Sequence, residues 1–171
     1  MTHSALAVRP ATVGDVPAMA RVHVQSWRET YRGLMPDSVL DDPHLVGARE
    51  QFWAAALTDP RYAQNRAAVA ELDGELIGVA MSGPVLEAGP GQRQLYVLYV
   101  LSSAFGSGAG PALLDAVLDA EESAMLWVAD PNPRAQAFYR RHGFEADGAE
   151  ASTFGVREVR MVRGPRPPSR I

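Results

Sequence analysis

The chain has 171 residues, of which 47% are hydrophobic and 21% charged, and its formal net charge is −4 at pH 7. This length and composition are typical of one globular domain and exclude a disordered chain. The negative charge argues against a nucleic-acid partner. The absence of cysteine excludes disulfides, thiolate metal sites and cysteine nucleophiles. All 16 basic residues are arginine, which also excludes the phosphate-binding lysine of nucleotide hydrolases.

The chain shows no sign of a membrane span or of a targeting segment. It lacks an apolar run of about 18 residues, and its N-terminus lacks the basic-then-apolar pattern of a secretory signal. We therefore expect a cytoplasmic protein without a membrane partner. Residues 1–164 are predicted to form the folded domain, and residues 165–171, rich in proline and arginine, a disordered tail.

The first part of the chain predicts a strand followed by two helices. The strand is expected at Leu6–Arg9, and Thr12 with Asp15 resembles a capping box that opens a helix. Apolar residues at three- and four-residue steps continue this helix to about Tyr31. A second helix is predicted over Gly47–Leu57.

A β-hairpin and a buried strand are expected next. Ala67–Leu72 and Glu75–Met81 flank Asp73-Gly74, a pair that favours a type I′ turn because both central residues need a positive φ. Beyond a loop rich in glycine and proline, Leu95–Leu101 is almost continuously apolar, as in a strand covered on both faces.

The second half predicts a strand–turn–helix–strand unit, one more helix and an antiparallel ending. The predicted helices are Pro111–Ala120 and a helix from Asn132-Pro133 to Arg141, and the predicted strands are Ala124–Ala129, Phe144–Ala149 and Val156–Val162. This order of elements favours a single-domain α/β fold in which helices flank a mixed, mostly antiparallel sheet.

The turn between the buried strand and the next helix contains three glycines at alternate positions, from Gly106 to Gly110. Backbone N–H groups at such a helix N-terminus suit a phosphate or pyrophosphate, while a tight turn without a ligand is the structural alternative. A dinucleotide site would add an acid about 20 residues further on, and Asp130 meets that spacing. However, the last glycine of the dinucleotide motif would fall at position 111, which is Pro111, and no further βαβ unit follows. We therefore reject the dinucleotide interpretation.

Two segments resemble the motifs of the GCN5-related N-acetyltransferases. Residues 98–114 resemble motif A, whose core is Arg/Gln-x-x-Gly-x-Gly/Ala, and residues 132–144 match motif B, N-x-x-A-x-x-F-Y-x-x-x-G-F, at every fixed position. Residues 8–12 and 27–33 also resemble the first strand and helix of small bacterial members. The resemblance covers nearly the whole chain, up to about Arg163.

The resemblance implies an acetyl-CoA-dependent N-acetyltransferase that acts on a small-molecule or peptide amine. It implies cofactor contacts from three regions: the end of the buried strand, the glycine turn and the motif B helix. The end of the buried strand would splay from the next strand and pair with pantetheine. The contact residues of the three regions are Leu98, Tyr99, Val100, Gly106, Ser107, Gly108, Ala109, Gly110, Asn132 and Phe138. The histidines show no metal-ligand spacing, so no metal is expected. The oligomeric state stays open, although homodimers are common in the family.

Tyr139 is the general acid that the resemblance implies. The matching tyrosine of the family donates its proton to the coenzyme A thiolate after a neutral amine has attacked the thioester directly in a ternary complex. A phenol with a pKa of about 10 keeps that proton at neutral pH. No general base is assigned, because Leu95–Leu101 contains no acid where many members have a glutamate, and Glu29 and His142 are better explained as solvated or packed side chains.

The chain departs from the motif at Phe105, where arginine or glutamine is usual, and at Pro111, which lacks an N–H group. We therefore expect weaker cofactor binding, not its loss, and Arg134 and Arg140 are the candidates to compensate for it. The departure also motivates an alternative function, a non-catalytic acyl-CoA-binding or regulatory domain, although such a domain would not need Tyr139.

The acceptor amine is expected near the end of the first long helix. Trp27, Glu29 and Tyr31 precede a loop marked by Gly33 and Pro36, and loops on a rigid scaffold often carry binding residues. These three side chains are predicted to line the amine pocket, with burial in the core as the alternative for Trp27.

Overall fold

The computed structural model of the chain describes residues 4–85 and 92–165. Its strands are β1 (Leu6–Pro10), β2 (Arg66–Leu72), β3 (Glu75–Pro84), β4 (Gln92–Val100), β5 (Ser123–Ala129), β6 (Glu145–Thr153) and β7 (Val156–Arg163). Its helices are α1 (Val16–Tyr31), α2 (Asp37–Leu40), α3 (Leu45–Thr58), α4 (Ala109–Val117) and α5 (Pro133–Arg141), with 3-10 turns η1 (Val13–Asp15), η2 (Pro60–Tyr62) and η3 (Ser102–Ala104). Almost all of the predicted tail, and most of the loop before β4, lie outside the described residues.

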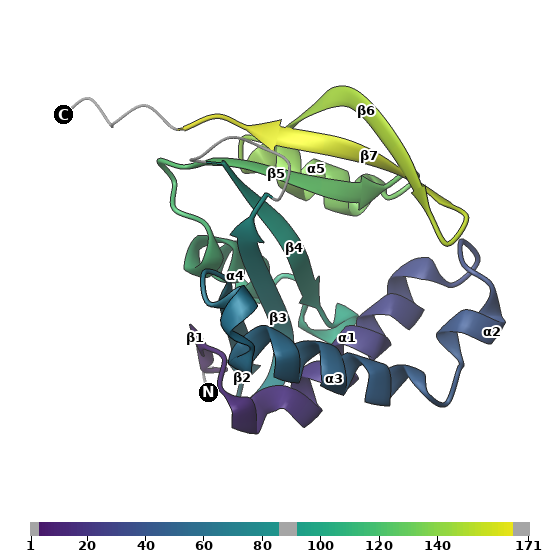
Figure 1. Cartoon of the computed structure of the whole chain (residues 1–171), viewed down its shortest axis with the longest axis vertical. Helices are drawn as coiled ribbons and strands as arrows, with labels where there is room; N and C mark the ends of the chain where they lie inside the picture. The colour runs from purple at the N-terminus through teal and green to yellow at the C-terminus, as the bar shows by residue number, and fades with distance from the viewer. Residues whose placement is uncertain (1–3, 86–91, 166–171) are drawn as a thin grey trace.

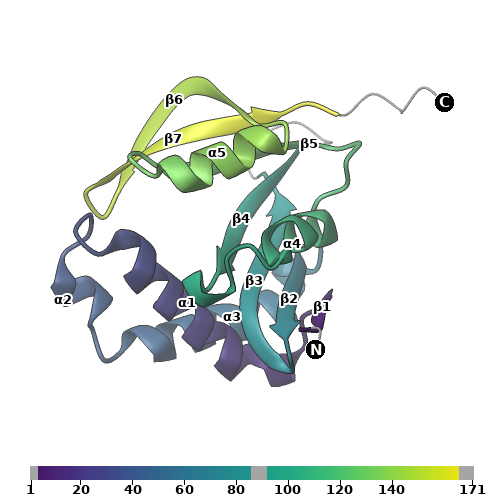
Figure 2. The same cartoon turned by 180° about the vertical axis from the view of Figure 1, so that it is seen from behind.

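The seven strands form one sheet in the order β1-β2-β3-β4-β5-β7-β6. Only β4 and β5 pair in parallel, and all other neighbours are antiparallel. Helices α1 and α3 cover one face of the N-terminal strands, and α4 and α5 lie on the opposite face (Figures 1 and 2). This arrangement confirms the predicted α/β class with a mixed, mostly antiparallel sheet. None of the helices in the described ranges has the length and apolarity that a membrane crossing requires.

The local signals in the N-terminal half produce the expected elements. The Thr12 backbone N–H donates to the Asp15 carboxylate at 2.8 Å, which completes the capping box. The segment it opens begins as the 3-10 turn η1, and α1 starts only at Val16. Asp73 and Gly74 have φ values of 53° and 85°, as a type I′ turn requires. Helix α2 was not predicted, because a helix of one turn shows no periodicity.

The helix after the glycine turn is shifted toward the N-terminus relative to the prediction. Gly108 is its N-cap in the left-handed conformation, so α4 begins at Ala109 and Pro111 is its third residue. The helix also ends earlier than expected, at Val117, because Leu118 is extended.

Strand β4 separates from β5 halfway along its length. The parallel register runs from Gln92 opposite Ser123 to Leu95 opposite Leu126 and stops there, whereas β4 stays paired with β3 as far as Val100. Figure 1 shows β5, β7 and β6 running away from β4 beyond this point. The splay that the resemblance implied is therefore present, and it leaves one edge of the end of β4 without a strand partner.

The expected covering of both faces of β4 fails at one residue. The register with β3 shifts between Met81 and Ser82, and Tyr96, which lies at this bulge, is 40% exposed. Its hydroxyl donates to the carbonyl of Pro84 at 2.7 Å. A bulge of this kind bends the strand locally, and here it precedes the segment that leaves β5.

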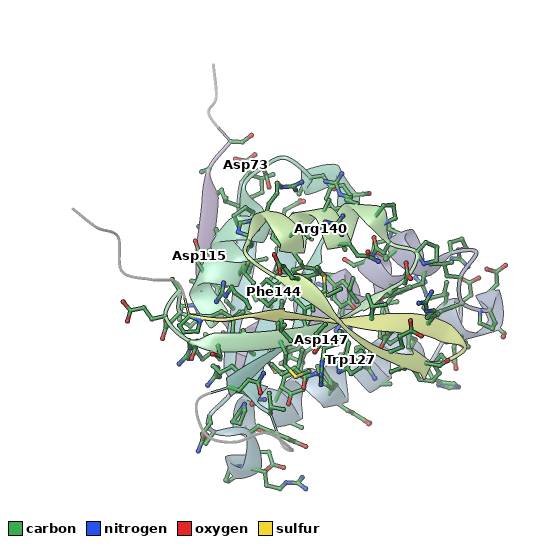
Figure 3. The ribbon with its side chains drawn as sticks, turned by 90° about the horizontal axis from the view of Figure 1, so that it is seen from above. Asp73, Asp115, Trp127, Arg140, Phe144 and Asp147 are labelled. Carbon is green, nitrogen blue, oxygen red and sulfur yellow. The ribbon has the colours of Figure 1, made fainter. Side chains whose placement is uncertain are left out.

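The C-terminal strands carry charged contacts on their surface. Arg160 of β7 lies over the ring of Trp127 and donates to the Asp147 carboxylate at 2.6 Å, which joins β5, β7 and β6 (Figure 3). The other face of β5 and β7 is apolar and packs in the same core as Tyr139 and Phe144. Helix α5 therefore packs through Tyr139 against the apolar face of the C-terminal strands.

Candidate active site

A cavity of about 620 Å³ opens where β4 and β5 separate. The walls come from β4, from the glycine turn, from α5 and from the end of α1. The predicted residues that line it are Tyr31, Leu98, Tyr99, Val100, Gly106, Gly108, Ala109, Gly110, Asn132, Phe138 and Tyr139. A second hollow of about 580 Å³, between β1, β2 and the end of α3, contains none of the predicted site residues.

The three glycines of the turn are required by their conformations and by close packing. Gly106 and Gly108 have φ values of 81° and 88°, which side chains rarely adopt. A Cβ atom on Gly110 would lie 3.2 Å from the Phe138 ring, tighter than an ordinary contact. The turn therefore brings its backbone close to α5 at the cavity wall.

Some backbone donors of the glycine turn are used within the turn itself. N–H groups in the first turn of a helix have no intrahelical carbonyl partner. The Ala109 N–H donates to the Ser107 hydroxyl at 3.3 Å, and the Ser107 N–H donates to Ala104. Ser107 thus supports the turn internally and does not line the cavity. Because Pro111 is the third residue of α4, the helix N-terminus has one donor fewer, as its sequence position predicted.

Helix α5 brings the Phe-Tyr pair of motif B to the cavity. The Asn132 side chain caps the helix by accepting a hydrogen bond from the Ala135 N–H at 3.3 Å. Phe138 packs against Gly110, and its ring lies 4.5 Å from that of His142, centroid to centroid. Tyr139 is buried on the same helix and contacts the ring of Phe144. The helix thereby joins the glycine turn to a buried phenol.

Three phenols meet at the floor of this cavity. Burial raises the pKa of Tyr139, and the neighbouring Tyr31 raises it further. Burial likewise holds the pKa of Tyr99 well above its usual value. Burial also raises the pKa of Tyr31, an effect that its interaction with the Tyr99 hydroxyl opposes. All three hydroxyls therefore keep their protons at neutral pH.

The three predicted acceptor residues take different positions. Tyr31 lines the cavity. Trp27 lies behind it, half-buried, and its indole N–H donates to the Tyr99 hydroxyl at 2.9 Å, so it supports the floor from within. Glu29 is exposed and accepts a hydrogen bond from the Ser102 backbone N–H. Neither Trp27 nor Glu29 belongs to the cavity lining.

The ionisable side chains of the cavity lining, apart from the tyrosines, are arginines and a histidine. Among the described residues, the lining includes Arg134, Arg141 and His142 but no carboxylate. Such a lining suits an anionic ligand. Nor does any group of three or more histidine, aspartate or glutamate side chains in residues 4–85 and 92–165 have an arrangement that would hold a metal ion.

One acid near the floor was not predicted. Glu158 of β7 pairs in register with Ala129 of β5, and its charge raises the pKa of Tyr31. The pattern of β7 gives no local sign of this proximity, since it arises only when β7 inserts between β5 and β6.

Comparisons with known proteins agree with this architecture. The model of the acetyltransferase (GNAT) family matches residues 24–144. The "Probable N-acetyltransferase Rv2775" of Mycobacterium tuberculosis (strain ATCC 25618 / H37Rv) is 31% identical over 156 residues, covering 86% of this chain and 84% of its own. The "Uncharacterized N-acetyltransferase YuaI" of Bacillus subtilis (strain 168) is 30% identical over 161 residues, covering 89% of each chain.

A solved structure shows the same fold. The PaiA N-acetyltransferase from Thermoplasma acidophilum, crystallised in complex with coenzyme A, superposes with a TM-score of 0.76 over 94% of this chain and 99% of its own, at 17% sequence identity. The family match, the relatives and the shared fold together show that the chain belongs to the acetyltransferase (GNAT) family of N-acetyltransferases.

Proposed function

We propose that the protein transfers an acetyl group from acetyl-CoA to a primary amine, which attacks the thioester directly in a ternary complex while Tyr139 acts as the general acid. The observation that carries this proposal is the position of Tyr139, a buried, protonated phenol in a cavity bounded by the glycine turn and by Tyr31. Membership of the family and the coenzyme A bound to the PaiA relative support the choice of co-substrate.

The co-substrate is proposed to extend from the glycine turn toward Tyr139. Its pyrophosphate would bind the N–H groups of the turn at the N-terminus of α4. Its pantetheine arm, which contains two amides, would pair with the edge of β4 between Leu98 and Val100 that β5 leaves free. This course brings the thioester to the floor of the cavity, where the Tyr139 hydroxyl lies.

In the proposed reaction, the amine nitrogen forms a bond to the thioester carbon and the carbon–sulfur bond breaks. The Tyr139 proton passes to the leaving sulfur, so that coenzyme A departs as the thiol. Burial raises the pKa of Tyr139, so the phenol holds this proton at neutral pH before the reaction begins. The amine attacks in its neutral form. With no carboxylate in the described lining, its surplus proton is expected to pass to solvent, and the Tyr139 phenolate regains a proton from solvent before the next turnover.

The alternative is a non-catalytic domain that binds acyl-CoA, motivated by Phe105 and Pro111 in the turn. The decisive experiment measures thiol release from acetyl-CoA with a panel of polyamines, amino acids, aminoglycosides, peptides and lysine-containing proteins, alongside calorimetric binding of coenzyme A. Amine-dependent thiol release that is lost in Tyr139→Phe supports the enzyme. Tight binding without release for any amine favours the alternative, and absence of binding contradicts both.

A further inference from the structure

Phe105 and Arg134 form a stacked pair at the wall of the cavity. The guanidinium carbon of Arg134, from the first turn of α5, lies 3.7 Å from the centroid of the Phe105 ring. Both residues line the cavity beside Gly106 and Gly108. Phe105 is 46% exposed, and the guanidinium of Arg134 lies over its ring. The negative face of an aromatic ring attracts a cation, so the ring holds the guanidinium next to the turn.

The guanidinium of Arg134 is available for an anion. Stacking uses its flat face and leaves its five N–H donors at the edges, where they match the oxygens of a phosphate. In the described part of the chain Arg134 takes part in no ion pair, whereas arginines such as Arg9, Arg66 and Arg157 each bind a carboxylate. Its charge is therefore not neutralised by a neighbouring acid.

The glycine turn itself provides no charge. No residue from Leu101 to Leu114 is charged, and Pro111 removes one backbone donor. A pyrophosphate at this turn would thus meet only backbone dipoles unless a cation came from elsewhere. Of the two arginines in the lining, Arg141 lies at the far end of α5, about 10 Å along the helix from Arg134. Arg134, by contrast, contacts Phe105 directly before the first glycine of the turn.

We propose that Arg134, held against Phe105, binds the pyrophosphate of the coenzyme and replaces the charge that the turn lacks. The inference rests on the proposed function, since it takes acetyl-CoA as the co-substrate. It assigns a binding role to an exposed arginine and a positioning role to an exposed phenylalanine, at a place where the chain departs from the family motif.

The test is calorimetric titration of coenzyme A and of 3′-dephospho-coenzyme A into matched variants. Arg134→Gln is expected to weaken the binding of both ligands by roughly tenfold, the scale of a charge-assisted hydrogen bond, and to make affinity less sensitive to salt. Arg140→Gln is the control, because Arg140 is exposed on the same helix (Figure 3) but does not line the cavity. It removes the same charge and should leave both affinities unchanged.

The outcomes separate this inference from the proposed function. Equal affinities in Arg134→Gln and Arg140→Gln would overturn it, and a loss seen with coenzyme A but not with 3′-dephospho-coenzyme A would move Arg134 to the 3′-phosphate. Adding Phe105→Arg to Arg134→Gln should restore affinity if the two positions serve the same phosphate, and a double variant as weak as the single one contradicts that equivalence. Failure of the unmodified protein to bind coenzyme A would contradict the proposed function itself.

Discussion

The carboxylate of Glu29 accepts a hydrogen bond from the backbone N–H of Ser102 at 2.8 Å. Glu29 lies near the end of α1, and Ser102 opens the 3-10 turn that leads into the glycine turn. The contact joins segments that are 73 residues apart in the sequence. The helix that brings Tyr31 to the cavity is thereby tied to the loop proposed to bind the coenzyme.

Removing this carboxylate should affect the coenzyme more than the amine. Glu29→Ala is expected to lower the free energy of unfolding by about 1 kcal/mol, as for loss of one hydrogen bond, and to weaken coenzyme A binding a few-fold because the start of the turn loosens. Calorimetry and thermal melts measure both effects, and Glu29→Gln, which keeps an acceptor oxygen, is the control. A raised KM for the amine with unchanged coenzyme affinity would instead place Glu29 in the acceptor pocket.

Replacing Tyr139 by phenylalanine removes only the hydroxyl. The ring contact with Phe144 should persist, so the melting temperature should change little, while turnover falls by roughly 10²–10⁴-fold, the usual contribution of general acid catalysis. The measurement is thiol release under conditions in which chemistry limits the rate. Burial raises the pKa of Tyr139. The phenol of the unmodified enzyme should therefore stay protonated near neutral pH, and its ionisation should not reduce turnover there. Undiminished turnover in the variant would exclude the proton-donor role.

Tyr31 offers a test of where the acceptor binds. Tyr31→Ala should raise the KM for the amine, since the side chain lines the cavity, and leave coenzyme A affinity nearly unchanged. Tyr31→Phe preserves the packing against the cluster of Met35 and Leu40 and isolates the contribution of the hydroxyl. A collapse of thermal stability in Tyr31→Ala, or an equal loss of both affinities, would show that the residue is structural.

Gly108 tests the turn through its backbone. Gly108→Ala forces a side chain into a φ of 88°, at a cost of about 1–2 kcal/mol, although the new Cβ would have room, 3.8 Å from Leu6. If the backbone shifts to relieve this strain, coenzyme A affinity should fall. Gly74→Ala is the matched control, with a φ of 85° in the β2–β3 hairpin and nothing within 4 Å of its Cβ. It should lose similar stability and keep its affinity.

His23 predicts a loss of stability in mild acid. It is buried in α1 and accepts a hydrogen bond at Nδ1 from the Trp53 indole N–H at 3.1 Å, which requires the neutral imidazole. Burial, reinforced by the charge of Arg49, lowers the pKa of His23 to about 3. Below a pH of about 6.5, His23 binds a proton in the unfolded chain but stays neutral in the folded protein. The stability contributed by neutral His23 is therefore complete above that pH and declines as the pH falls toward 3.

The expected slope is up to about 1.4 kcal/mol per pH unit, measurable by denaturant unfolding between pH 6.5 and pH 5. This window lies above the range in which Asp15 titrates, since its hydrogen bond to Arg9 lowers the pKa of Asp15 to about 2. His23→Asn retains an acceptor for Trp53 and should reduce the slope, whatever its effect on absolute stability. An unchanged slope would mean that His23 is protonated in the folded protein.

The sequence by itself determined the features that depend on neighbouring residues. Three such features are formed by residues at most three positions apart: the Thr12–Asp15 capping box, the Asp73-Gly74 turn and the Asn132 cap. Their chemistry could therefore be predicted from the sequence. The two motifs are equally local, and the resemblance to the family and the choice of Tyr139 depend on them alone. The helix ends were less well defined by local pattern, as at Ala109, because one left-handed glycine sets the start of α4.

Only the tertiary structure decided which side chains meet. Tyr31, Tyr99 and Tyr139 come from α1, β4 and α5, and they converge because β4 leaves β5 at Leu95 and opens a space between the two halves of the sheet. The same holds for Arg134 on Phe105 and for Glu29 on Ser102. These contacts join distant segments, and no local pattern encodes them, because their geometry is set by how the helices pack across the splayed sheet.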